Sequence, residues 1–544
     1  MTDDKKMFTK RIRSLKNFTQ LKLIILTSIF LVLFDNYAFF KSTVDIYPIH
    51  ENIAFLFSLG VVLGTLTTLL LILFSSKYTT KAILIIVVLV SSLTNYFMNT
   101  YFVVIDSEMI RNTVQTNMNE LLDLLTLNQV GYFLFLGVLP SWFIYRSKIV
   151  YQPMRIELIV KMKVIVISLL IISGTVFIFS RYYTSFFREH KPLRYATNPT
   201  YWIYSIGDYI NKIYNNGPVI VNAIGEDAKV VRKQGDKHKI VIVVVGEAAR
   251  ADHFSLNGYE RETNPLLVKQ DVINLSNVFS CGTSTAVSVP CMFSIYDHND
   301  YSYNKGISTQ NVLDVLSHTN EIAVLWRDNN SNSKGVALRV PFEDYRMPEN
   351  NPICEGSECR DEGMLAGLDS YIDQHPKKDI LIVLHQMGNH GPAYYKRYPK
   401  RFEMYTPVCE TNQVEQCTQE EINNAYDNAL LYTDYFLNAT IEFLKKYDKT
   451  HATAMVYMSD HGESLGENGL YLHGLPYVMA PESQTHISAL MWFNTFFNVE
   501  KKIQKFKKSK DKEYTHDNLF HTLLGLFNVQ TSVYQPSKDI LYIP

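Results

Sequence analysis

The sequence carries almost no net charge, because 52 Lys and Arg residues stand against 53 Asp and Glu, for a formal net charge of −1 at pH 7. This balance provides no electrostatic signal for nucleic acid or for a strongly charged partner. The sequence also has no C-x-x-C motif, which disfavours a zinc site built on thiolates. No small-residue cleavage site follows the first apolar run, so this run is predicted to span a membrane and not to be a signal peptide.

No cysteine occurs before residue 281. The six cysteines fall into three pairs of sequence neighbours, which are Cys281 and Cys291, Cys354 and Cys359, and Cys409 and Cys417. Three short disulfides in an oxidising compartment are therefore expected. Zinc-thiolate binding and free buried thiols are the alternatives, and the even count in close pairs argues against free thiols.

Long apolar runs dominate the first 180 residues, and the remainder is typical of soluble protein. A transmembrane helix needs about 20 apolar residues. Five runs approach this length, at residues 21–40, 53–74, 82–104, 130–145 and 159–180. Basic residues cluster before the first run, between the second and third, and around the start of the fifth. With five spans these clusters all lie on one side of the membrane, which is then cytoplasmic. Residues 1–180 are thus predicted to be a five-span transmembrane domain, and the rest of the chain lies outside, where disulfides form.

Residues 181–239 mix aromatic and cationic side chains, such as Phe186, Trp202 and Arg194, before turning polar. This composition favours helices at a membrane–water interface followed by a linker, and a packed bridge without lipid contact is the alternative. Between the third and fourth runs, Asn112, Thr116 and Glu120 recur every four residues. On a helix they share one face, although a solvated face explains the spacing equally well.

Residues 240–544 alternate short β-rich apolar runs with longer mixed segments, which predicts an α/β domain. The run at 240–245 is apolar on both faces, as expected of a central parallel strand. Further strands are predicted at 322–326, 380–385, 454–458 and 489–493, and a helix at 517–527.

Polar side chains follow four of these strands, and ligands of open α/β sheets bind at the carboxyl ends of strands. Glu247 follows the first strand, Asn330 lies after the second, His390 after the third, and Asp460 with His461 after the fourth. Carboxylates and imidazole suit zinc or a similar metal. We therefore predict a metal site with Glu247, Asp460 and His461 as ligands, against the alternative of a capping Asp and a surface His.

A cluster of small hydroxyl residues, S-C-G-T-S-T-A-V-S, occupies residues 280–288. A metal that lowers the pKa of one hydroxyl would make it a nucleophile, and a helix start there would favour a phosphate. Spacing alone leaves four candidates, which are Thr283, Ser284, Thr285 and Ser288. A Ser/Thr-rich helix cap is the alternative.

Five motifs together resemble the lipid A phosphoethanolamine transferases, a family with chromosomal EptA-type and mobile MCR-type colistin-resistance enzymes. The motifs are V-V-V-G-E-A-A-R-A-D-H, S-C-G-T-S-T-A-V-S-V-P-C-M-F-S, W-R-D-N-N-S-N-S-K-G, H-Q-M-G-N-H-G-P and S-D-H-G-E-S-L-G-E-N-G-L-Y-L-H-G. The resemblance covers nearly the whole chain. It implies that residues 240–544 are a periplasmic catalytic domain like alkaline phosphatase and the sulfatases, with a mostly parallel sheet between helices.

The resemblance also implies roles for individual residues. It implies zinc bound by Glu247, Thr285, Asp460 and His461, with Thr285 as the nucleophile. It links His390 and His473 to substrate binding or to a second zinc. It places Asn330, Ser331 and Lys334 near the phosphoethanolamine group, and Asn112, Thr116 and Glu120 on the membrane side of the substrate site.

The predicted function is zinc-dependent transfer of phosphoethanolamine from phosphatidylethanolamine to a lipid A phosphate, through a covalent intermediate on Thr285. The added amine would weaken binding of cationic polymyxins. We expect a multi-pass protein of the bacterial inner membrane, acting as a monomer. The main alternative keeps this chemistry with another acceptor, a core sugar or a periplasmic glucan. A sulfatase is disfavoured because the hydroxyl loop lacks the C/S-x-P-x-R pattern, and transport because Asp35 and Asn95 lie only near span ends.

Overall fold

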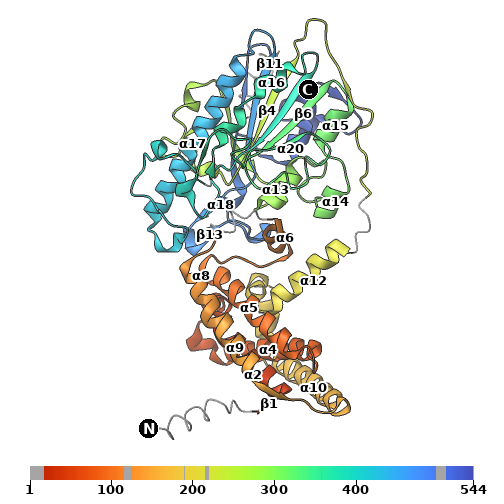
Figure 1. Cartoon of the computed structure of the whole chain (residues 1–544), viewed down its shortest axis with the longest axis vertical. Coiled ribbons are helices and arrows are strands. Elements are labelled where there is room, and N and C mark those ends of the chain that lie inside the picture. Colours follow the sequence, from red (N-terminus) through yellow and green to blue (C-terminus); the bar gives the residue numbers. More distant parts are fainter. Residues whose placement is uncertain are drawn as a thin grey trace. The chain divides into compact units, whose positions relative to one another are not determined.

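The computed structural model describes residues 17–115, 124–188, 190–214, 220–356, 358–497 and 510–542. The chain divides into two compact units, Met1–Ile110 with Leu125–Ile210, and Arg111–Leu124 with Asn211–Pro544. We call them the helical unit and the α/β unit (Figure 1).

The helical unit is built from long apolar helices. Its main elements are α2 (Gln20–Phe34), α3 (Tyr37–Ile46), α4 (Ile49–Phe74), α5 (Thr80–Thr100), α8 (Leu127–Tyr132), a π-helical turn (Phe133–Val138), α9 (Leu139–Arg146), α10 (Met154–Ile178), α11 (Ser180–Arg188) and a 3-10 turn (Lys191–Ala196). Helices α6 (Ser107–Gln115) and α12 (Thr200–Tyr214) each cross a boundary between the units. A short parallel pair joins β1 (Asn17–Thr19) to β2 (Lys148–Val150).

The expected count of five membrane spans is not confirmed. Three helical stretches of the described residues, Ile49–Phe74, Thr80–Thr100 and Leu127–Arg146, are long and apolar enough to cross a membrane. A fourth span results if the pair α2 and α3, which is bent by 55°, counts as one. The bend follows Asp35, where the Asn36 side chain donates hydrogen bonds to Leu31 O at 2.9 Å and to Asn198 O at 2.6 Å. The first of these bonds adds to the helical bond that Leu31 O still accepts from Asp35 N at 2.9 Å.

The α/β unit is organised around one sheet of eight strands in the order β15-β5-β14-β11-β4-β10-β6-β7. The strands are β4 (Lys239–Gly246), β5 (Ile273–Phe279), β6 (Ile322–Asp328), β7 (Phe342–Asp344), β10 (Asp379–His385), β11 (Ala452–Ser459), β14 (His486–Phe493) and β15 (Tyr514–Thr515). Strand β14 is antiparallel to both of its neighbours, and the other pairings are parallel. All five strands predicted from the apolar runs are present, because both faces of these strands are buried.

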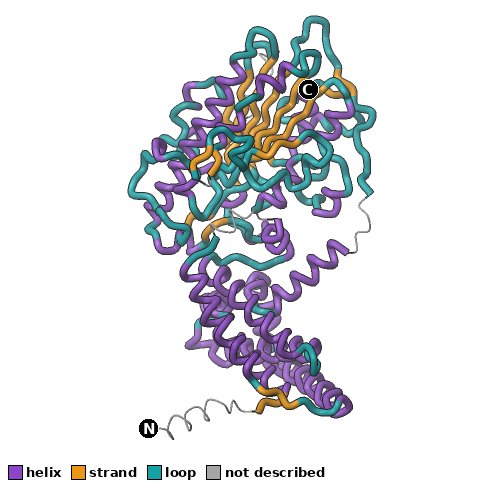
Figure 2. Tube along the Cα trace, in the orientation of Figure 1, coloured by secondary structure: helices purple, strands orange, loops and turns teal. Residues whose placement is uncertain are grey.

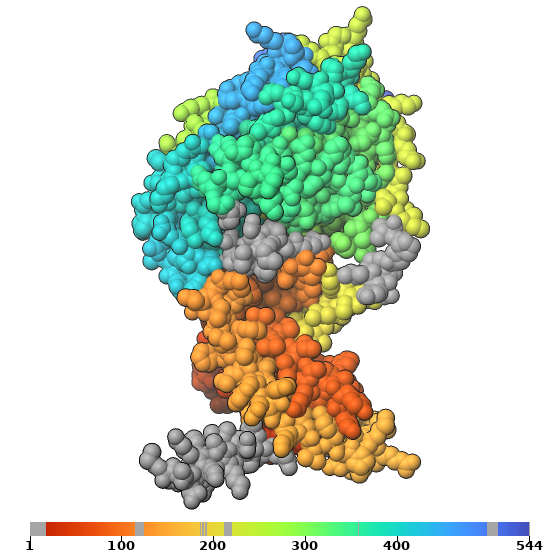
Figure 3. Space-filling view, viewed as in Figure 1, coloured from red at the N-terminus to blue at the C-terminus, as the bar shows by residue number. Residues whose placement is uncertain are grey.

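Helices cover the sheet, so that it forms the middle layer (Figures 1 and 2). They are α13 (Thr285–Met292), α14 (Tyr303–Ile307), α15 (Val312–His318), α16 (Leu368–Asp373), α17 (Gln419–Lys445), α18 (Glu482–Thr485) and α20 (Asp517–Leu526). Alternate valines of β4, such as Val241 and Val243, pack in one core with α13, α15 and α20. In the space-filling view, segments coloured green and cyan form much of the visible surface of the α/β unit (Figure 3).

Short two-stranded pairs complete the α/β unit. They are β3 (Lys229–Val230) with β16 (Val529–Gln530), β8 (Cys354–Glu355) with β9 (Glu358–Cys359), and β12 (Ser464–Leu465) with β13 (Tyr471–Leu472). The three expected disulfides are present, and they link Cys281 to Cys291, Cys354 to Cys359, and Cys409 to Cys417.

Candidate active site

The candidate site lies where the central parallel strands end. Glu247 directly follows β4, and Asp460 and His461 directly follow β11. Strands β4 and β11 pair in parallel with Gly246 opposite Ser459, so Glu247 and Asp460 leave the sheet side by side. The three side chains have no exposed surface.

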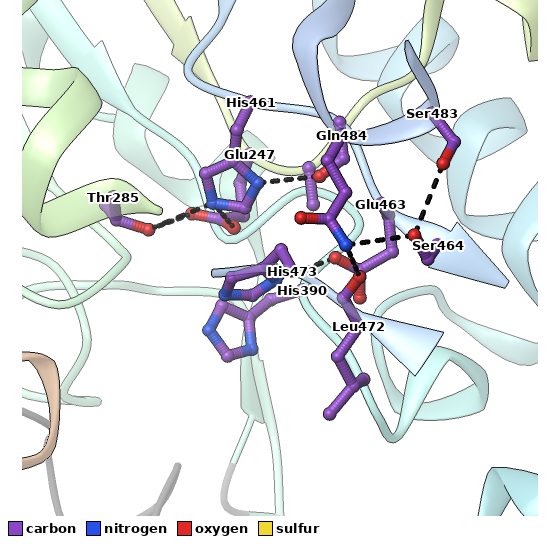
Figure 4. Close-up of polar contacts among 12 residues, drawn as sticks. Glu247, Thr285, His390, His461, Glu463, Ser464, Leu472, His473, Ser483 and Gln484 are labelled. Carbon is purple, nitrogen blue, oxygen red and sulfur yellow. Dashed lines mark hydrogen bonds and ion pairs between the residues drawn. The ribbon is translucent and has the colours of Figure 1, made fainter. Parts of the chain in front are cut away.

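These residues and Thr285 form what we call the Glu247 cluster (Figure 4). His461 Nε2 lies 3.4 Å from Glu247 Oε1 and 3.4 Å from Asp460 Oδ2. Both of these carboxylate oxygens are buried and have no hydrogen-bond partner among the described residues. Buried carboxylate oxygens without a partner are energetically costly, so the cluster is suited to a bound cation.

The other oxygen of Asp460 is held by the backbone. Asp460 Oδ1 accepts hydrogen bonds from His461 N at 2.7 Å and from Ala248 N at 3.2 Å. Ala248 has a φ of 53°, a left-handed conformation that non-glycine residues rarely adopt. Its carbonyl is fixed by the Tyr426 hydroxyl at 2.6 Å. The strained turn after β4 therefore aims Asp460 Oδ2 toward the centre of the cluster.

The imidazole of His461 is oriented in the same way. Its Nδ1 lies 2.8 Å from Gly462 O, so Nδ1 carries the proton and donates it to that carbonyl. Nε2 is then left with its lone pair, which is the arrangement that metal-ligating histidines have. Glycine is required at position 462, because a Cβ there would lie 2.1 Å from Ser483 O.

The ligand atoms of Glu247, Asp460 and His461 lie within 4.8 Å of one another. Two carboxylates, one imidazole and a nearby hydroxyl form a four-atom donor set that suits tetrahedral zinc. The unpaired Oε1 and Oδ2 support the same conclusion, because a cation would satisfy both. The residues present therefore fit the metal that the sequence resemblance implies.

Thr285 brings a hydroxyl to this cluster. It is the first residue of α13, and its Oγ1 donates to Glu247 Oε2 at 3.2 Å and lies 3.4 Å from His461 Nε2. The other hydroxyls of the loop are placed differently: Thr283 donates to Leu475 O at 2.6 Å, and Ser288 is fully buried. Of the four candidate hydroxyls, the structure records contacts to Glu247 and His461 for Thr285.

The loop before α13 is braced on several sides. The Cys281–Cys291 disulfide ties it to the end of α13. His516 accepts a hydrogen bond from Cys281 N at 3.0 Å and lies 2.9 Å from Ser459 O, so Nε2 carries its proton. Burial lowers the pKa of His516 to about 4, which keeps this link neutral. Thr285 is therefore held against the end of β11.

A second group, the Glu463 cluster, consists of Glu463, His473 and Tyr394. Glu463 Oε1 accepts a hydrogen bond from the Tyr394 hydroxyl at 2.7 Å, and Oε2 lies 2.7 Å from His473 Nδ1. Burial lowers the pKa of His473, but the charge of Glu463, the hydrogen bond to it and the charge of Glu247 together raise the pKa more, so the net shift is upward. His461, Glu463 and His473 also have metal-ligand spacing. Both Glu463 oxygens are already bonded, however, so this cluster has less need of a cation.

His473 of the Glu463 cluster lies close to His461 of the Glu247 cluster and to His390. Its ring centroid lies 4.2 Å from that of His461 and 5.9 Å from that of His390 (Figure 4). The structure therefore brings together both histidines that the resemblance linked to the site. Glu463 and Tyr394 were missed by the sequence analysis, although Glu463 lies only three residues after Asp460 in D-H-G-E.

The remaining predicted residues are placed as follows. Asn330 donates from Nδ2 to Glu247 Oε2 at 2.7 Å, a contact the sequence did not indicate. Ser331 is buried beside it, and Lys334 follows in a left-handed conformation with a φ of 49°. Asn112 lies half-buried on α6. Thr116 and Glu120 lie outside the described residues.

Comparison with known proteins identifies the family. The family described as "Phosphoethanolamine transferase EptA/EptB" matches residues 63–214, and the Sulfatase family matches residues 239–529. "Phosphatidylethanolamine transferase Mcr-2" of Escherichia coli is 42% identical over 515 residues, covering 93% of this chain and 94% of its own length. The chain belongs to the phosphoethanolamine transferase family.

Two further relatives agree with this assignment. "Phosphoethanolamine transferase EptA" of Salmonella typhimurium is 37% identical over 531 residues, covering 96% of each chain. The solved "Integral membrane protein lipooligosaccharide phosphoethanolamine transferase A (EptA)" from Neisseria meningitidis matches with a TM-score of 0.91 at 34% identity. It covers 96% of this chain and 98% of its own. Membership of the phosphoethanolamine transferases, expected from five motifs, is confirmed, as is the sulfatase-like fold of the α/β unit.

Proposed function

We propose that the protein transfers phosphoethanolamine from phosphatidylethanolamine to a lipid A phosphate, through a phosphothreonine-type intermediate on Thr285, and thereby confers polymyxin resistance. The observation that carries this proposal is the position of Thr285 Oγ1, 3.2 Å from Glu247 Oε2 and 3.4 Å from His461 Nε2. A hydroxyl at a predicted metal site and at a helix start is suited to attack a phosphodiester.

The substrate assignment is supported by relatives. The Mcr relatives are named phosphatidylethanolamine transferases, and the solved relative from Neisseria meningitidis is named for lipooligosaccharide. We extend a lipid donor and a lipid acceptor of this kind to the present chain. Apolar helices long enough to cross a membrane support a membrane location, which suits lipid substrates.

Zinc bound by Glu247, Asp460, His461 and Thr285 would lower the pKa of the hydroxyl and neutralise charge on the phosphoryl oxygens. Thr285 Oγ1 passes its proton to Glu247 Oε2, to which it is hydrogen-bonded, and bonds to the phosphorus of the donor, while the bond from phosphorus to the diacylglycerol oxygen breaks. His473, whose pKa is raised beside Glu463, would give a proton to that oxygen. Diacylglycerol leaves, and phosphoethanolamine stays on Thr285.

In the second half of the reaction, an oxygen of the lipid A phosphate bonds to the same phosphorus. The bond from phosphorus to Thr285 Oγ1 breaks, Oγ1 takes back the proton held on Glu247 Oε2, and the proton of the attacking phosphate returns to His473. His390, Asn330, Ser331 and Lys334 contact the phosphoethanolamine group in this proposal, and Asn112, Thr116 and Glu120 contact the lipid substrates from the membrane side. Most of the acceleration comes from fixed position and charge neutralisation.

We further propose that the protein is a monomer in the bacterial inner membrane. Residues 1–180 form its transmembrane domain, residues 181–239 its interfacial segment, and residues 240–544 its periplasmic catalytic domain. Three disulfides in the α/β unit support an oxidising location for this part of the chain.

Mass spectrometry of lipid A from a Gram-negative host tests the proposal directly. Wild-type protein should add phosphoethanolamine to lipid A, and Thr285→Ala should abolish the adduct. Thr285→Ser should retain part of the activity, because it keeps the hydroxyl. Trapped wild-type protein should carry phosphoethanolamine on Thr285.

Three results would contradict parts of the proposal. Unmodified lipid A with well-folded wild-type protein would overturn the acceptor, and core sugars and glucans would then be examined. An adduct that survives Thr285→Ala would overturn the nucleophile. Transfer that continues undiminished after zinc removal would overturn the metal requirement.

A further inference from the structure

A buried carboxylate outside the Glu247 cluster, Asp328 at the end of β6, accepts four hydrogen bonds. Its Oδ2 accepts from Trp326 Nε1 at 2.9 Å and lies 2.9 Å from His385 Nδ1. Its Oδ1 accepts from the backbone N of Asn330 and of Asn332, each at 3.0 Å. Asp328 has no exposed surface and is fully bonded, so it binds no substrate itself.

The two backbone bonds to Asp328 Oδ1 shape the turn that carries Asn330. Asn332, two residues further on, has a φ of 73°, a left-handed conformation that the second of these bonds helps to hold. From this turn, Asn330 Nδ2 donates to Glu247 Oε2 at 2.7 Å and to Gln386 O at 2.9 Å. A continuous chain of hydrogen bonds therefore runs from Asp328 through Asn330 to the Glu247 carboxylate.

His385, at the end of the neighbouring strand β10, completes this arrangement. It pairs in register with Asp328 on one side and with Val245, two residues before Glu247, on the other. Burial opposes both charges, but the ion pair and the hydrogen bonds and charges around it together outweigh burial. The pKa of Asp328 is lowered and that of His385 is raised. The charged pair thus ties the end of β6 to the end of β10, beside the Glu247 cluster.

We propose that Asp328 and His385 are positioning residues which, through Asn330, fix the Glu247 carboxylate for metal binding. Asn330 and Thr285 both bond to Oε2, which leaves Oε1 free to face His461 Nε2 and the centre of the cluster. A carboxylate held by one oxygen presents the other in a defined direction. This inference rests on the proposed metal role of Glu247. It assigns to Asn330 the role of holding the metal ligand Glu247, in addition to any contact with the substrate.

Partners that orient a metal ligand typically change metal affinity about 10- to 100-fold when they are removed. A merely structural ion pair would instead lower thermal stability without changing the metal affinity of the protein that remains folded. The two roles therefore differ in a measurable way, and a double-mutant cycle separates them.

The experiment uses the full chain in detergent, with zinc affinity from chelator competition and thermal unfolding measured in parallel. The variants are Asp328→Asn, Asn330→Ala and the double variant. Each single substitution should raise the zinc Kd by about 10- to 100-fold. In the double variant the Kd should be no higher than in Asn330→Ala, because the link to Glu247 is already gone. The two losses in Tm should still add, because Asp328 also bonds to Trp326, His385 and the turn backbone.

A matched control is the second buried carboxylate–imidazole pair, in which Asp427 Oδ1 lies 2.7 Å from His253 Nδ1. Asp427 also accepts from Tyr259 and Arg261, so it accepts three hydrogen bonds where Asp328 accepts four. Asp427→Asn should lower the Tm but leave the zinc Kd unchanged. Excess zinc should restore activity in Asp328→Asn, because the chemistry itself is intact.

The proposal is overturned if wild-type protein binds zinc and Asp328→Asn or Asn330→Ala leaves the Kd unchanged. It is also overturned if the two increases in Kd multiply in the double variant. Should Asp328→Asn fail to fold, His385→Gln replaces it in the same cycle, with the same expected outcome. If wild-type protein transfers phosphoethanolamine but binds no zinc at Glu247, the inference fails while the transfer reaction stands. If no transfer occurs but the zinc cycle behaves as expected, only the proposed function fails.

Discussion

The Glu247 cluster and the Glu463 cluster have similar composition but differ in how their carboxylates are satisfied. In the Glu247 cluster, Glu247 Oε1 and Asp460 Oδ2 are buried without a hydrogen-bond partner among the described residues. In the Glu463 cluster, Tyr394 and His473 each bond to one Glu463 oxygen at 2.7 Å. The first cluster is thus incomplete without a cation, and the second is complete within the protein. Residue types alone therefore do not identify a metal site. Whether a carboxylate needs a cation depends on whether each of its oxygens already has a hydrogen-bond partner.

The largest expected difference between the two clusters is the effect on the zinc Kd of replacing one carboxylate. We expect Asp460→Asn to raise the zinc Kd by more than about 100-fold, beyond the usual effect of a supporting residue. Glu463→Gln should change the Kd by less than about tenfold, because its oxygens are already bonded. Chelator competition with both purified variants measures this difference. Equal losses in the two variants would show that the clusters form one metal site.

Zinc removal should destabilise the protein through the Glu247 cluster. A ligand present at about 100 times its Kd stabilises the folded state by about 2.7 kcal/mol. Chelation should therefore lower the Tm of wild-type protein by about 4 to 8 °C, measured by thermal unfolding. Glu463→Gln should show the same decrease, and Asp460→Asn should show almost none. A chelation response that survives in Asp460→Asn would place the stabilising zinc elsewhere.

Removal of one hydroxyl should test whether the Glu463 cluster is complete by itself. Tyr394→Phe leaves Glu463 Oε1 buried and unpaired, which should lower the free energy of unfolding by about 1–3 kcal/mol. The zinc Kd should not change, since Tyr394 touches no atom of the Glu247 cluster that the structure records. Urea unfolding gives the first quantity and chelator competition the second. Tyr447→Phe, which removes an exposed hydroxyl bonded to Asp369, is the control and should have a smaller effect.

The smallest expected difference is one of pH dependence. The pKa of His473 is raised, because the charge and hydrogen bond of Glu463 and the charge of Glu247 together outweigh the effect of burial. Folded protein therefore holds this proton more tightly than unfolded protein. The stability that it contributes is fully present below pH 6.5, the ordinary pKa, and is lost as pH rises through the raised value. The difference in Tm between metal-free wild type and Glu463→Gln should therefore shrink from pH 5.5 to pH 8.5. A difference that grows with pH would contradict the assignment.

Much of the α/β fold could be predicted because its central strands are buried on both faces. Continuous apolar runs marked β4, β6, β10, β11 and β14 with errors of a few residues at their ends. Strand β5, with the sequence I-N-L-S-N-V-F, was not predicted, because its mixed pattern does not stand out from that of a loop. The short strands β7 and β15 depend on pairing with their neighbours and carry no signal of their own.

The helical unit shows the limit of hydropathy. The apolar run at 21–40 was expected to be one span, but Asn36 bonds to the Leu31 and Asn198 carbonyls and the helix bends by 55°. Asn198 lies 162 residues away in sequence, so no local pattern indicates this contact. The position of this bend therefore could not be predicted from hydropathy.

The sequence by itself determined the family, the class of the α/β unit, the three cysteine pairs and the residue types at the ends of the central strands. Long motifs and continuous apolar runs carry this information locally, because strand formation and turn chemistry depend on near neighbours. Only the tertiary structure decided that Thr285, and not Thr283 or Ser288, reaches Glu247. It also decided that Asn330 holds Glu247. Both oxygens of Glu463 have hydrogen-bond partners, whereas Asp460 Oδ2 has none among the described residues. These outcomes depend on distances between residues far apart in the chain, which are set by the register of the parallel strands.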